Sequence, residues 1–261
     1  MIFKNVQKYK KVSKIVYFCI QRFVMKTSAL IFAAGLGTRL YPLTANRPKA
    51  LVRYQGEPLL KIVMDKVIAA GIQDVVVNVH HFPDQIIDFL KKSNFDANIR
   101  VSDERAYLRD TAGGLKFAEP LLNNSTYILL YNVDILSNIS IPTLLDEHIS
   151  SGADVTLAVR ARKTSRYLVF DESNMRLCGW HNVTTGERKG ETEFPGATEL
   201  AFSGIHVVNN QFVRAIPSVE KHSLTPFYIE NANRFFIRGF QHQNDDWMDV
   251  GKYEEFANVL T

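Results

Sequence analysis

The sequence predicts an α/β protein: a doubly wound, mostly parallel mixed sheet with a β-rich C-terminal extension on the same domain. Through the first 160 residues, short apolar runs alternate with stretches that have the spacing of amphipathic helices. This alternation is typical of βαβ crossovers, which give parallel strands. After about residue 160 the helical spacing gives way to shorter strand-like pieces separated by turns.

The individual elements follow from these patterns. The candidate strands of the first part are the apolar runs 29–33, 75–79, 99–101, 127–131 and 155–159, and the candidate helices are 59–70, 84–92, 114–122 and 142–150. In the later part we expect strands at 167–171, 176–180 and 200–208 and a last helix at 253–260. Since no repeat or low-complexity linker interrupts the pattern, residues 25–261 are expected to form a single domain.

The formal charge of +4 comes from the N-terminal residues. Residues 1–24 contain six basic residues and no acidic one, so the chain from Met25 onward is slightly acidic. This distribution argues against a nucleic-acid partner. Because Met25 stands directly before the first predicted strand, we expect translation to begin there and residues 1–24 to be an extension outside the domain.

The apolar run 15–20 in that extension is too short to span a bilayer, and no small-residue cleavage site follows it. We therefore expect no membrane span, with a basic helix at a membrane surface as the alternative. Cys19 and Cys178 lie far apart and form no CxxC pair. They argue against a disulfide scaffold or a cysteine-ligated zinc and favour a cytoplasmic location.

The loop that follows the first predicted strand has the composition of a polyphosphate site. Residues 32–49 read FAAGLGTRLYPLTANRPK. Gly35 and Gly37 let backbone N–H groups approach an anion, and Arg39 and Lys49 supply positive charge. The pattern GxxxxGK[ST] is absent, and the third glycine of a dinucleotide-binding GxGxxG is replaced by Leu40.

Two aspartates follow apolar runs in distant parts of the chain. Asp134 ends YILLYNVD, and Asp249 lies in WMDVG. Carboxylate oxygens suit Mg²⁺, which takes one or two of them and completes its shell with water and phosphate. Together the two residues predict a magnesium clamp, although either alone is more often a helix cap or a surface acid. The histidines form no metal-ligand pattern, and no nucleophile elbow is present.

The stretch LIFAAGLGTRLYPLTANRPKALV resembles the signature GxGTRLxPLTxxxPKxL of the sugar-1-phosphate nucleotidyltransferases, and the resemblance extends over residues 25–261. It implies a Rossmann-like nucleotidyltransferase fold and Mg²⁺ as cofactor. The catalytic residues it implies are Arg39, Lys49, Asp134 and Asp249, with the metal held by Asp134 and Asp249. The implied nucleotide-binding residues are Ala34, Gly35, Gly37, Thr38, Thr111, Ala112, Gly113 and Asn132.

Within this resemblance, Thr111-Ala112-Gly113-Gly114 is similar to the family segment that reads the nucleobase, with backbone N–H groups at the start of a helix. Glu104 also resembles a family glutamate near the base pocket. The family strand with the pattern F-x-G-[IV] is similar to residues 202–205. By this likeness, Gly204 leaves room for the sugar, and Glu199, which precedes this strand, is expected to bind sugar hydroxyls. Arg162 lies in the basic run 160–163 at the end of a predicted strand and is expected to supply a cation to the sugar phosphate.

The implied reaction is transfer of a nucleotidyl group from a nucleoside triphosphate to a sugar 1-phosphate, with Arg39 on the leaving phosphates and Lys49 near the α-phosphate or the incoming phosphate. Short relatives of similar outline include N-acetylmuramate-1-phosphate uridylyltransferases and mannose- or heptose-1-phosphate guanylyltransferases, so UTP and GTP both remain open. A phosphocholine cytidylyltransferase and a catalytically silent nucleotide-sugar sensor on the same fold are the alternatives. We expect a monomer or a homodimer.

Overall fold

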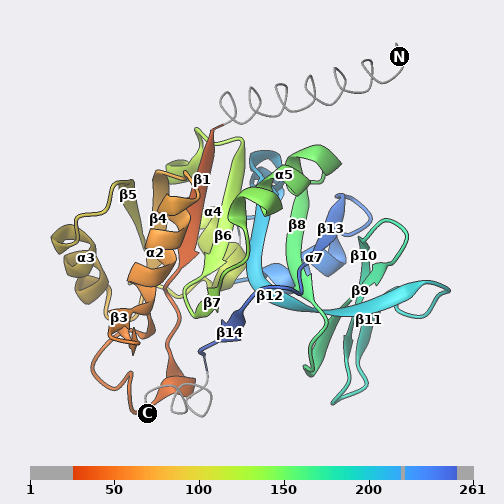
Figure 1. Ribbon diagram of the computed structural model, residues 1–261, viewed down its shortest axis with the longest axis horizontal. Coiled ribbons are helices and arrows are strands. Elements are labelled where there is room, and N and C mark those ends of the chain that lie inside the picture. Colours follow the sequence, from red (N-terminus) through yellow and green to blue (C-terminus); the bar gives the residue numbers. More distant parts are fainter. Residues whose placement is uncertain (1–25, 219–220, 252–261) are drawn as a thin grey trace, which may run out of the picture.

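The computed structural model describes residues 26–218 and 221–251. The N-terminal extension over residues 1–24 and the helix predicted over residues 253–260 lie outside the described residues. Within them, one large mixed sheet runs through the molecule, and helices cover both of its faces (Figure 1). The structure is therefore α/β.

The first part of the chain alternates between strands and helices as the sequence predicts. The strands are β1 (Thr27–Phe32), β4 (Asp74–Val79), β5 (Asn98–Asp103), β6 (Tyr127–Asn132) and β8 (Val155–Arg160), and the helices are α2 (Leu59–Ala69), α3 (Pro83–Lys92), α4 (Asp110–Leu122) and α5 (Ile141–Ser151). Two 3-10 turns, η1 (Thr38–Leu40) and η2 (Lys49–Leu51), and a small hairpin of β2 (Arg53–Tyr54) and β3 (Glu57–Pro58) lie between β1 and α2.

The second part is rich in strands. It contains β9 (Arg166–Asp171), β10 (Arg176–Asn182), β11 (Arg188–Gly190), β12 (Ala197–Asn209) and β13 (Ile237–Gln241), with the short helices α6 (Asn210–Ala215) and α7 (Leu224–Glu230). A separate two-stranded sheet joins β7 (Ile135–Ser137) to β14 (Trp247–Asp249). The sequence analysis had not located α6, α7 or β13.

The large sheet has the strand order β11-β10-β13-β8-β12-β6-β1-β4-β5, and β9 pairs with β10 and β12. Strands β6, β1, β4 and β5 are parallel, as are β8 and β13. Strand β12 is antiparallel to β6, β8 and β9, and β10 is antiparallel to β9, β11 and β13. The expectation of a mostly parallel sheet thus fits one half only, because turns join many of the later strands directly.

The strands of the parallel half are buried on both faces. In β1, Ala29 and Ile31 join the apolar core that also contains residues of α2, α3 and α5, whereas Leu30 joins the core that contains residues of α4, α6 and α7. In Figure 1, α2 lies in front of the sheet and α4 behind it. Burial on both faces explains why these strands read as continuous apolar runs. None of the described helices is both long and apolar enough to cross a membrane.

Candidate active site

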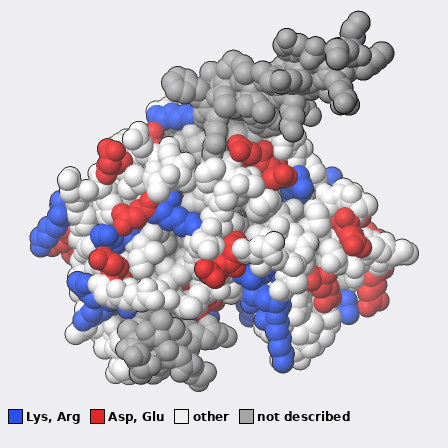
Figure 2. Space-filling view, in the orientation of Figure 1, with Lys and Arg blue, Asp and Glu red and all other residues white. Residues whose placement is uncertain are grey.

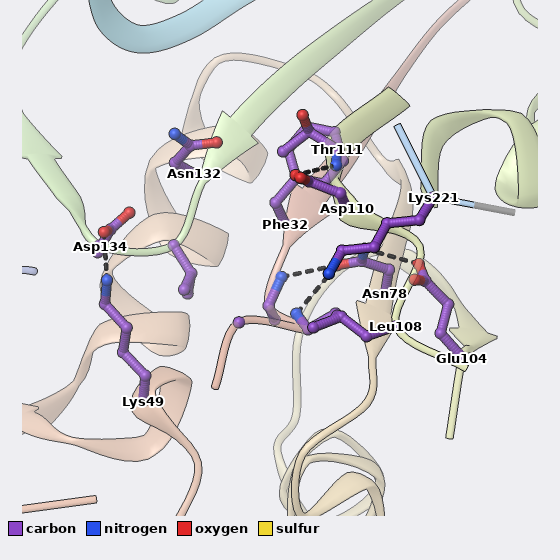
Figure 3. A pocket seen from close by; sticks show the side chains of 14 residues that line it. Phe32, Lys49, Asn78, Glu104, Leu108, Asp110, Thr111, Asn132, Asp134 and Lys221 are labelled. Carbon is purple, nitrogen blue, oxygen red and sulfur yellow. Dashed lines mark hydrogen bonds and ion pairs between the residues drawn. The ribbon is translucent and has the colours of Figure 1, made fainter. Parts of the chain in front are cut away.

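A cavity of about 360 Å³ lies at the carboxyl ends of β1, β4 and β6 (Figure 3). Because these strands are parallel neighbours, the segments that follow them meet at one edge of the sheet. The described residues that line the cavity are Phe32, Ala33, Ala34, Gly35, Lys49, Asn78, Glu104, Leu108, Asp110, Thr111, Asn132, Val133, Asp134 and Lys221. Apart from the predicted metal ligand Asp134, this lining includes five of the residues that the sequence predicted for the site: Ala34, Gly35, Lys49, Thr111 and Asn132.

Asn78 joins three walls of this cavity. Its Oδ1 accepts hydrogen bonds from the backbone N–H groups of Ala33 (2.7 Å) and Ala34 (3.2 Å), and its Nδ2 donates to Oε1 of Glu104 (2.8 Å; Figure 3). The side chain is almost completely buried, so it fixes the direction in which the loop leaves β1. Sequence reasoning did not select Asn78, although a polar residue inside the apolar run 75–79 was the available signal.

Glu104 is a buried carboxylate on the cavity wall. Besides Asn78, it accepts a hydrogen bond at Oε2 from the backbone N–H of Arg109 (3.3 Å). Burial raises the pKa of Glu104 above its usual range, and the two hydrogen bonds oppose that rise. Gly114 makes the placement possible, since a Cβ there would lie 2.8 Å from Oε1 of Glu104. The carboxylate can therefore pack against α4 and still face the cavity.

The first turn of α4 is tied to the segment 222–224. The N–H groups of Ala112 (2.9 Å) and Gly113 (3.2 Å) both donate to the carbonyl oxygen of His222. The chain itself therefore uses the two N–H groups that were expected to face a nucleobase, and neither residue lines the cavity.

The same segment makes two further hydrogen bonds with the entrance of α4. The N–H of His222 donates to the carbonyl of Arg109 (3.0 Å), and the N–H of Leu224 donates to Oγ1 of Thr111 (2.9 Å). The segment thereby places Lys221 at the cavity that Asn78 also lines (Figure 3). Sequence analysis had no signal for Lys221, because only the folded chain brings it to α4.

The two-stranded sheet brings the predicted metal ligands side by side. Asp134 directly precedes β7, and Asp249 lies opposite Ile135 in the β7–β14 pair. The N–H of Val250 donates to the backbone carbonyl of Asp134 (2.9 Å). Gly251 packs against both carboxylates, since a Cβ there would lie 2.6 Å from Oδ1 of Asp249 and 2.8 Å from Oδ2 of Asp134.

Two basic residues flank this carboxylate pair. Nζ of Lys49 forms an ion pair with Oδ2 of Asp134 (Figure 3). Nη2 of Arg39 lies 3.0 Å from the position that a Cβ of Gly251 would occupy. The structure thus brings Arg39, Lys49, Asp134 and Asp249 together around Gly251.

The donor set of this cluster fits Mg²⁺. Burial, followed by the neighbouring charge of Asp134, raises the pKa of Asp249, whereas a hydrogen bond from the N–H of Gly251 (2.8 Å) opposes the rise. A divalent cation between the carboxylates would relieve the repulsion that raises this pKa. Among residues 26–218 and 221–251, no group of three or more His, Cys, Asp or Glu side chains forms a larger metal cage. Two carboxylates with room for phosphate and water are what Mg²⁺ requires.

A second cavity, of about 670 Å³, begins at Asp249. Asp134 and Lys49 line the first cavity, whereas Asp249 and Arg39 line the second, so the carboxylate pair stands at the junction between the two. Two ligands, one in each cavity, would meet at this pair. The described residues that line the second cavity are Arg39, Arg162, Thr164, Ser165, Arg166, Leu168, Trp180, Lys189, Phe202, Ser223, Thr225, Pro226, Ile229 and Asp249.

Of the three residues predicted to bind sugar phosphate, Arg162 lines the second cavity. Its Nη2 donates to the carbonyl of Phe202 (3.0 Å), and its guanidinium lies 4.4 Å from the ring centroid of Trp247. Glu199 does not line this cavity, because its neighbour Leu200 pairs with the cavity residue Leu168 and adjacent residues of a strand face opposite sides. The predicted contact of Glu199 with the sugar therefore does not fit its position.

Gly204 and Gly37 were expected to contact ligands, but in the structure both are needed for close packing of the chain. Gly204 has a φ of +74°, and a Cβ there would lie 2.7 Å from Cγ1 of Ile135 and 3.0 Å from Nδ2 of Asn132. Gly37 has a φ of +69°, and a Cβ there would lie 2.9 Å from Cγ2 of Thr44. Gly204, Gly37 and the adjacent Thr38 line neither cavity, so they shape the chain around the site.

A buried hydrogen-bond chain holds the end of β13 to β12, and no sequence pattern had indicated it. His242 Nε2 lies 2.7 Å from Oγ of Ser203, and His242 Nδ1 lies 2.8 Å from both carboxylate oxygens of Asp245. Although this is the residue set of a hydrolase triad, Ser203 is completely buried and neither cavity reaches it. Trp247 Nε1 also donates to the carbonyl of Ser203 (2.9 Å), so the chain positions the segment that leads to Asp249.

Comparison with known proteins identifies relatives that match most of the chain. The chain is 32% identical over 233 residues to the N-acetylmuramate alpha-1-phosphate uridylyltransferase of Caulobacter vibrioides, covering 85% of this chain and 91% of that protein. It is 31% identical over 239 residues to a mannose-1-phosphate guanyltransferase of Gibberella zeae, covering 88% of this chain but only 62% of that longer protein.

Solved structures share the fold at lower sequence identity. A crystal structure of HddC from Yersinia pseudotuberculosis complexed with GMP-PN superposes with a TM-score of 0.70 at 20% identity, covering 90% of this chain and 98% of that one. A putative glucose-1-phosphate thymidylyltransferase from Bacillus anthracis, in complex with a sucrose, gives a TM-score of 0.73 at 16% identity, covering 89% of this chain and 93% of that one. The family model described as nucleotidyl transferase matches residues 28–261, so the chain belongs to the nucleotidyl transferase family and is a nucleotidyltransferase, as its sequence motifs indicated.

Proposed function

We propose that the chain catalyses Mg²⁺-dependent transfer of a nucleotidyl group from UTP or GTP to a sugar 1-phosphate. The observation that carries this proposal is the carboxylate pair Asp134 and Asp249 at the junction of two cavities, flanked by Arg39 and Lys49. The nucleotide would occupy the first cavity and the sugar phosphate the second. The names of the relatives from Caulobacter vibrioides and Gibberella zeae support both the reaction and the two nucleotides.

In the proposed reaction, a phosphate oxygen of the sugar 1-phosphate attacks the α-phosphorus of the nucleotide. The new P–O bond forms as the bond between the α-phosphorus and the bridging oxygen breaks, and pyrophosphate leaves with that oxygen and its electron pair. Both reactants are polyanions, so catalysis depends on positioning and on compensation of negative charge. Mg²⁺ held by Asp134 and Asp249 would supply charge compensation for the phosphates.

The basic residues of the cluster have separate places in this scheme. Lys49 lines the first cavity beside Asp134, where it would face the α-phosphate. Arg39 lines the second cavity beside Asp249, so it would stabilise phosphate oxygens at the junction. Loss of one such preorganised charge costs on the order of 10² to 10³ in turnover.

The Glu104 carboxylate in the first cavity supports the choice of UTP or GTP. Uracil has an N–H donor at N3 and guanine has one at N1, whereas the equivalent nitrogens of cytosine and adenine are acceptors. An ionised carboxylate accepts hydrogen bonds and repels other acceptors. The basic lining of the second cavity, Arg162, Arg166 and Lys189, disfavours the quaternary ammonium of phosphocholine as acceptor.

The test is pyrophosphate release measured with Mg²⁺ for four nucleoside triphosphates against the 1-phosphates of N-acetylmuramate, mannose, glucose and a heptose, and against phosphocholine. We expect turnover with UTP or GTP and a sugar 1-phosphate, and its loss with EDTA and in Asp249→Asn. Turnover with phosphocholine and CTP would refute the proposed acceptor. If no acceptor reacts while nucleotide still binds in calorimetry, the chain is a sensor and the proposed reaction is wrong.

A further inference from the structure

The second cavity carries more positive charge than one sugar phosphate requires. Its described lining contains four basic residues, Arg39, Arg162, Arg166 and Lys189, against the single acidic residue Asp249. Arg39 and Asp249 belong to the carboxylate cluster at one end of the cavity. Figure 2 shows basic side chains gathered at the lower centre of the drawn face, about where the connection from β8 to β9 lies in Figure 1.

Arg166 and Lys189 form a separate part of this cavity, on the face of the sheet made by β9, β10 and β11. Trp180 in β10 lies directly opposite Leu168 in β9 and opposite Lys189 in β11. Directly opposed residues share a face, and Arg166 shares the face of Leu168 because it is two residues away. The result is an aromatic floor with one basic residue on either side of it.

The charges of these two residues are available to a ligand. Among the residues that the structure describes, the Arg166 side chain has no ion-pair partner, and its backbone N–H donates to Thr164. Nζ of Lys189 lies 3.4 Å from Oε1 of Glu187, with both side chains about half exposed, and 5.8 Å from the ring centroid of Trp180. Exposed ion pairs of this kind are weak and are readily exchanged for another anion.

In the proposed reaction, Arg162 would bind the anomeric phosphate without help from this pair. Its guanidinium is anchored by the carbonyl of Phe202 and stacks on Trp247, which lies two residues before Asp249. It is therefore held at the end of the cavity where the proposed reaction takes place. A pyranose ring packed on Trp180 would then present a substituent to Arg166 and Lys189.

We propose, on the basis of the proposed function, that the acceptor is an acidic sugar 1-phosphate whose second anionic group binds Arg166 and Lys189. A guanidinium binds carboxylate and phosphate oxygens through two parallel hydrogen bonds, and an ammonium adds a point charge. The second group is a carboxylate or a second phosphate, both of which match this chemistry. A neutral sugar would offer no anionic group to Arg166, and Lys189 would keep its exposed pair with Glu187.

Two matched pairs of acceptors test this inference. N-acetylmuramate 1-phosphate differs from N-acetylglucosamine 1-phosphate by a carboxylate-bearing ether, and glucose 1,6-bisphosphate differs from glucose 1-phosphate by a second phosphate. We expect kcat/KM for the acidic member of one pair to exceed that of its neutral partner at least about tenfold. The pair that shows this difference identifies the anionic group. Equal or better use of both neutral members would overturn the inference.

The variants Arg166→Gln and Lys189→Gln assign the effect to these residues. Each should lower the acidic-to-neutral ratio about threefold to tenfold through KM, with little change in kcat for the neutral sugar. Arg188→Gln is the matched control, since Arg188 is the neighbour of Lys189 on the opposite face of β11 and pairs with Glu193. Equal losses with acidic and neutral acceptors in Arg166→Gln and Lys189→Gln would contradict the inference.

Binding measurements separate this inference from the proposed reaction. If no acceptor releases pyrophosphate, the proposed function fails, and calorimetry with the same four sugar phosphates decides the inference. Binding of an acidic member to the wild type and Arg188→Gln, weakened in Arg166→Gln and Lys189→Gln, would support it. Equal affinity for acidic and neutral members, or no binding of either, would overturn it.

Discussion

Gly251→Ala should damage the carboxylate cluster without unfolding the protein. An alanine Cβ would lie 2.6 Å from Oδ1 of Asp249, 2.8 Å from Oδ2 of Asp134 and 3.0 Å from Nη2 of Arg39, where ordinary contact begins at 3.4 Å. The three groups must therefore withdraw by roughly 0.4 to 0.8 Å. A displacement of about 1 Å at a reacting centre costs on the order of 10²-fold in rate, so we expect kcat to fall about 10- to 100-fold.

The assay is pyrophosphate release over a Mg²⁺ titration, with thermal unfolding measured alongside. Since the backbone of Gly251 is not in the left-handed region, alanine there should leave the melting temperature within a few degrees of the wild type. Gly152→Ala is the control: Gly152 has a φ of +67° at the end of α5 and no neighbouring atom within 4 Å of an added Cβ, so it should lose about 1 kcal/mol of stability and no activity. If Gly251→Ala keeps kcat within threefold of the wild-type value at saturating Mg²⁺, the close packing of Asp134, Asp249 and Arg39 around Gly251 is refuted.

Three further predictions follow from buried or paired groups. Asp134→Asn should retain the fold and lose a factor of at least about 10² in turnover. The control variant Asp88→Asn, at an exposed position of α3, should have the turnover of the wild type. Equal activity of the two variants would remove Asp134 from the mechanism. Asn78→Ala removes the hydrogen-bond partner of the Ala33 N–H and of Oε1 of the buried Glu104 carboxylate, so urea denaturation should show a loss of about 2 to 4 kcal/mol. A loss below about 1 kcal/mol would contradict the bonding we describe. Burial lowers the pKa of His148 to about 4, so as the pH falls below about 6.5 the unfolded chain binds a proton at this residue before the folded protein does. The free energy of unfolding should therefore fall by up to about 3 kcal/mol towards pH 4. His148→Gln should make this dependence of the unfolding free energy on pH less steep, and an unchanged dependence would contradict the prediction.

The residues that meet at the carboxylate cluster could be located from the sequence because they lie in short contiguous motifs. The loop with Arg39 and Lys49 and the two aspartates each follow an apolar run, and strand ends in an open α/β sheet are where ligands bind. The parallel half of the sheet could also be predicted, because strands that are buried on both faces appear in the sequence as uninterrupted apolar runs. Strand β13 was missed because Ile237–Gln241 is short and contains a glycine and an arginine.

Predictions failed where long-range hydrogen bonds decide which groups remain free. Gly113 looks like a donor to a base in the sequence, but its N–H is bonded to a carbonyl more than a hundred residues away in the chain. Gly204 looks like space for a sugar, yet it accommodates the side chains of Ile135 and Asn132 where β12 changes its register against β8. A motif identifies residue types, whereas the fold determines which of their donors and surfaces are already in use.

The segment 221–225 shows why neither ligand site can be assigned from one motif. Lys221 lines the first cavity, and Ser223 and Thr225 line the second. Between them, the backbone of His222 is bonded to both sides of the entrance of α4, so the two contributions have a fixed spacing. The two cavities and the carboxylate pair at their junction are consequently tied together by this segment, and their positive charge comes both from the glycine-rich loop and from the later strands.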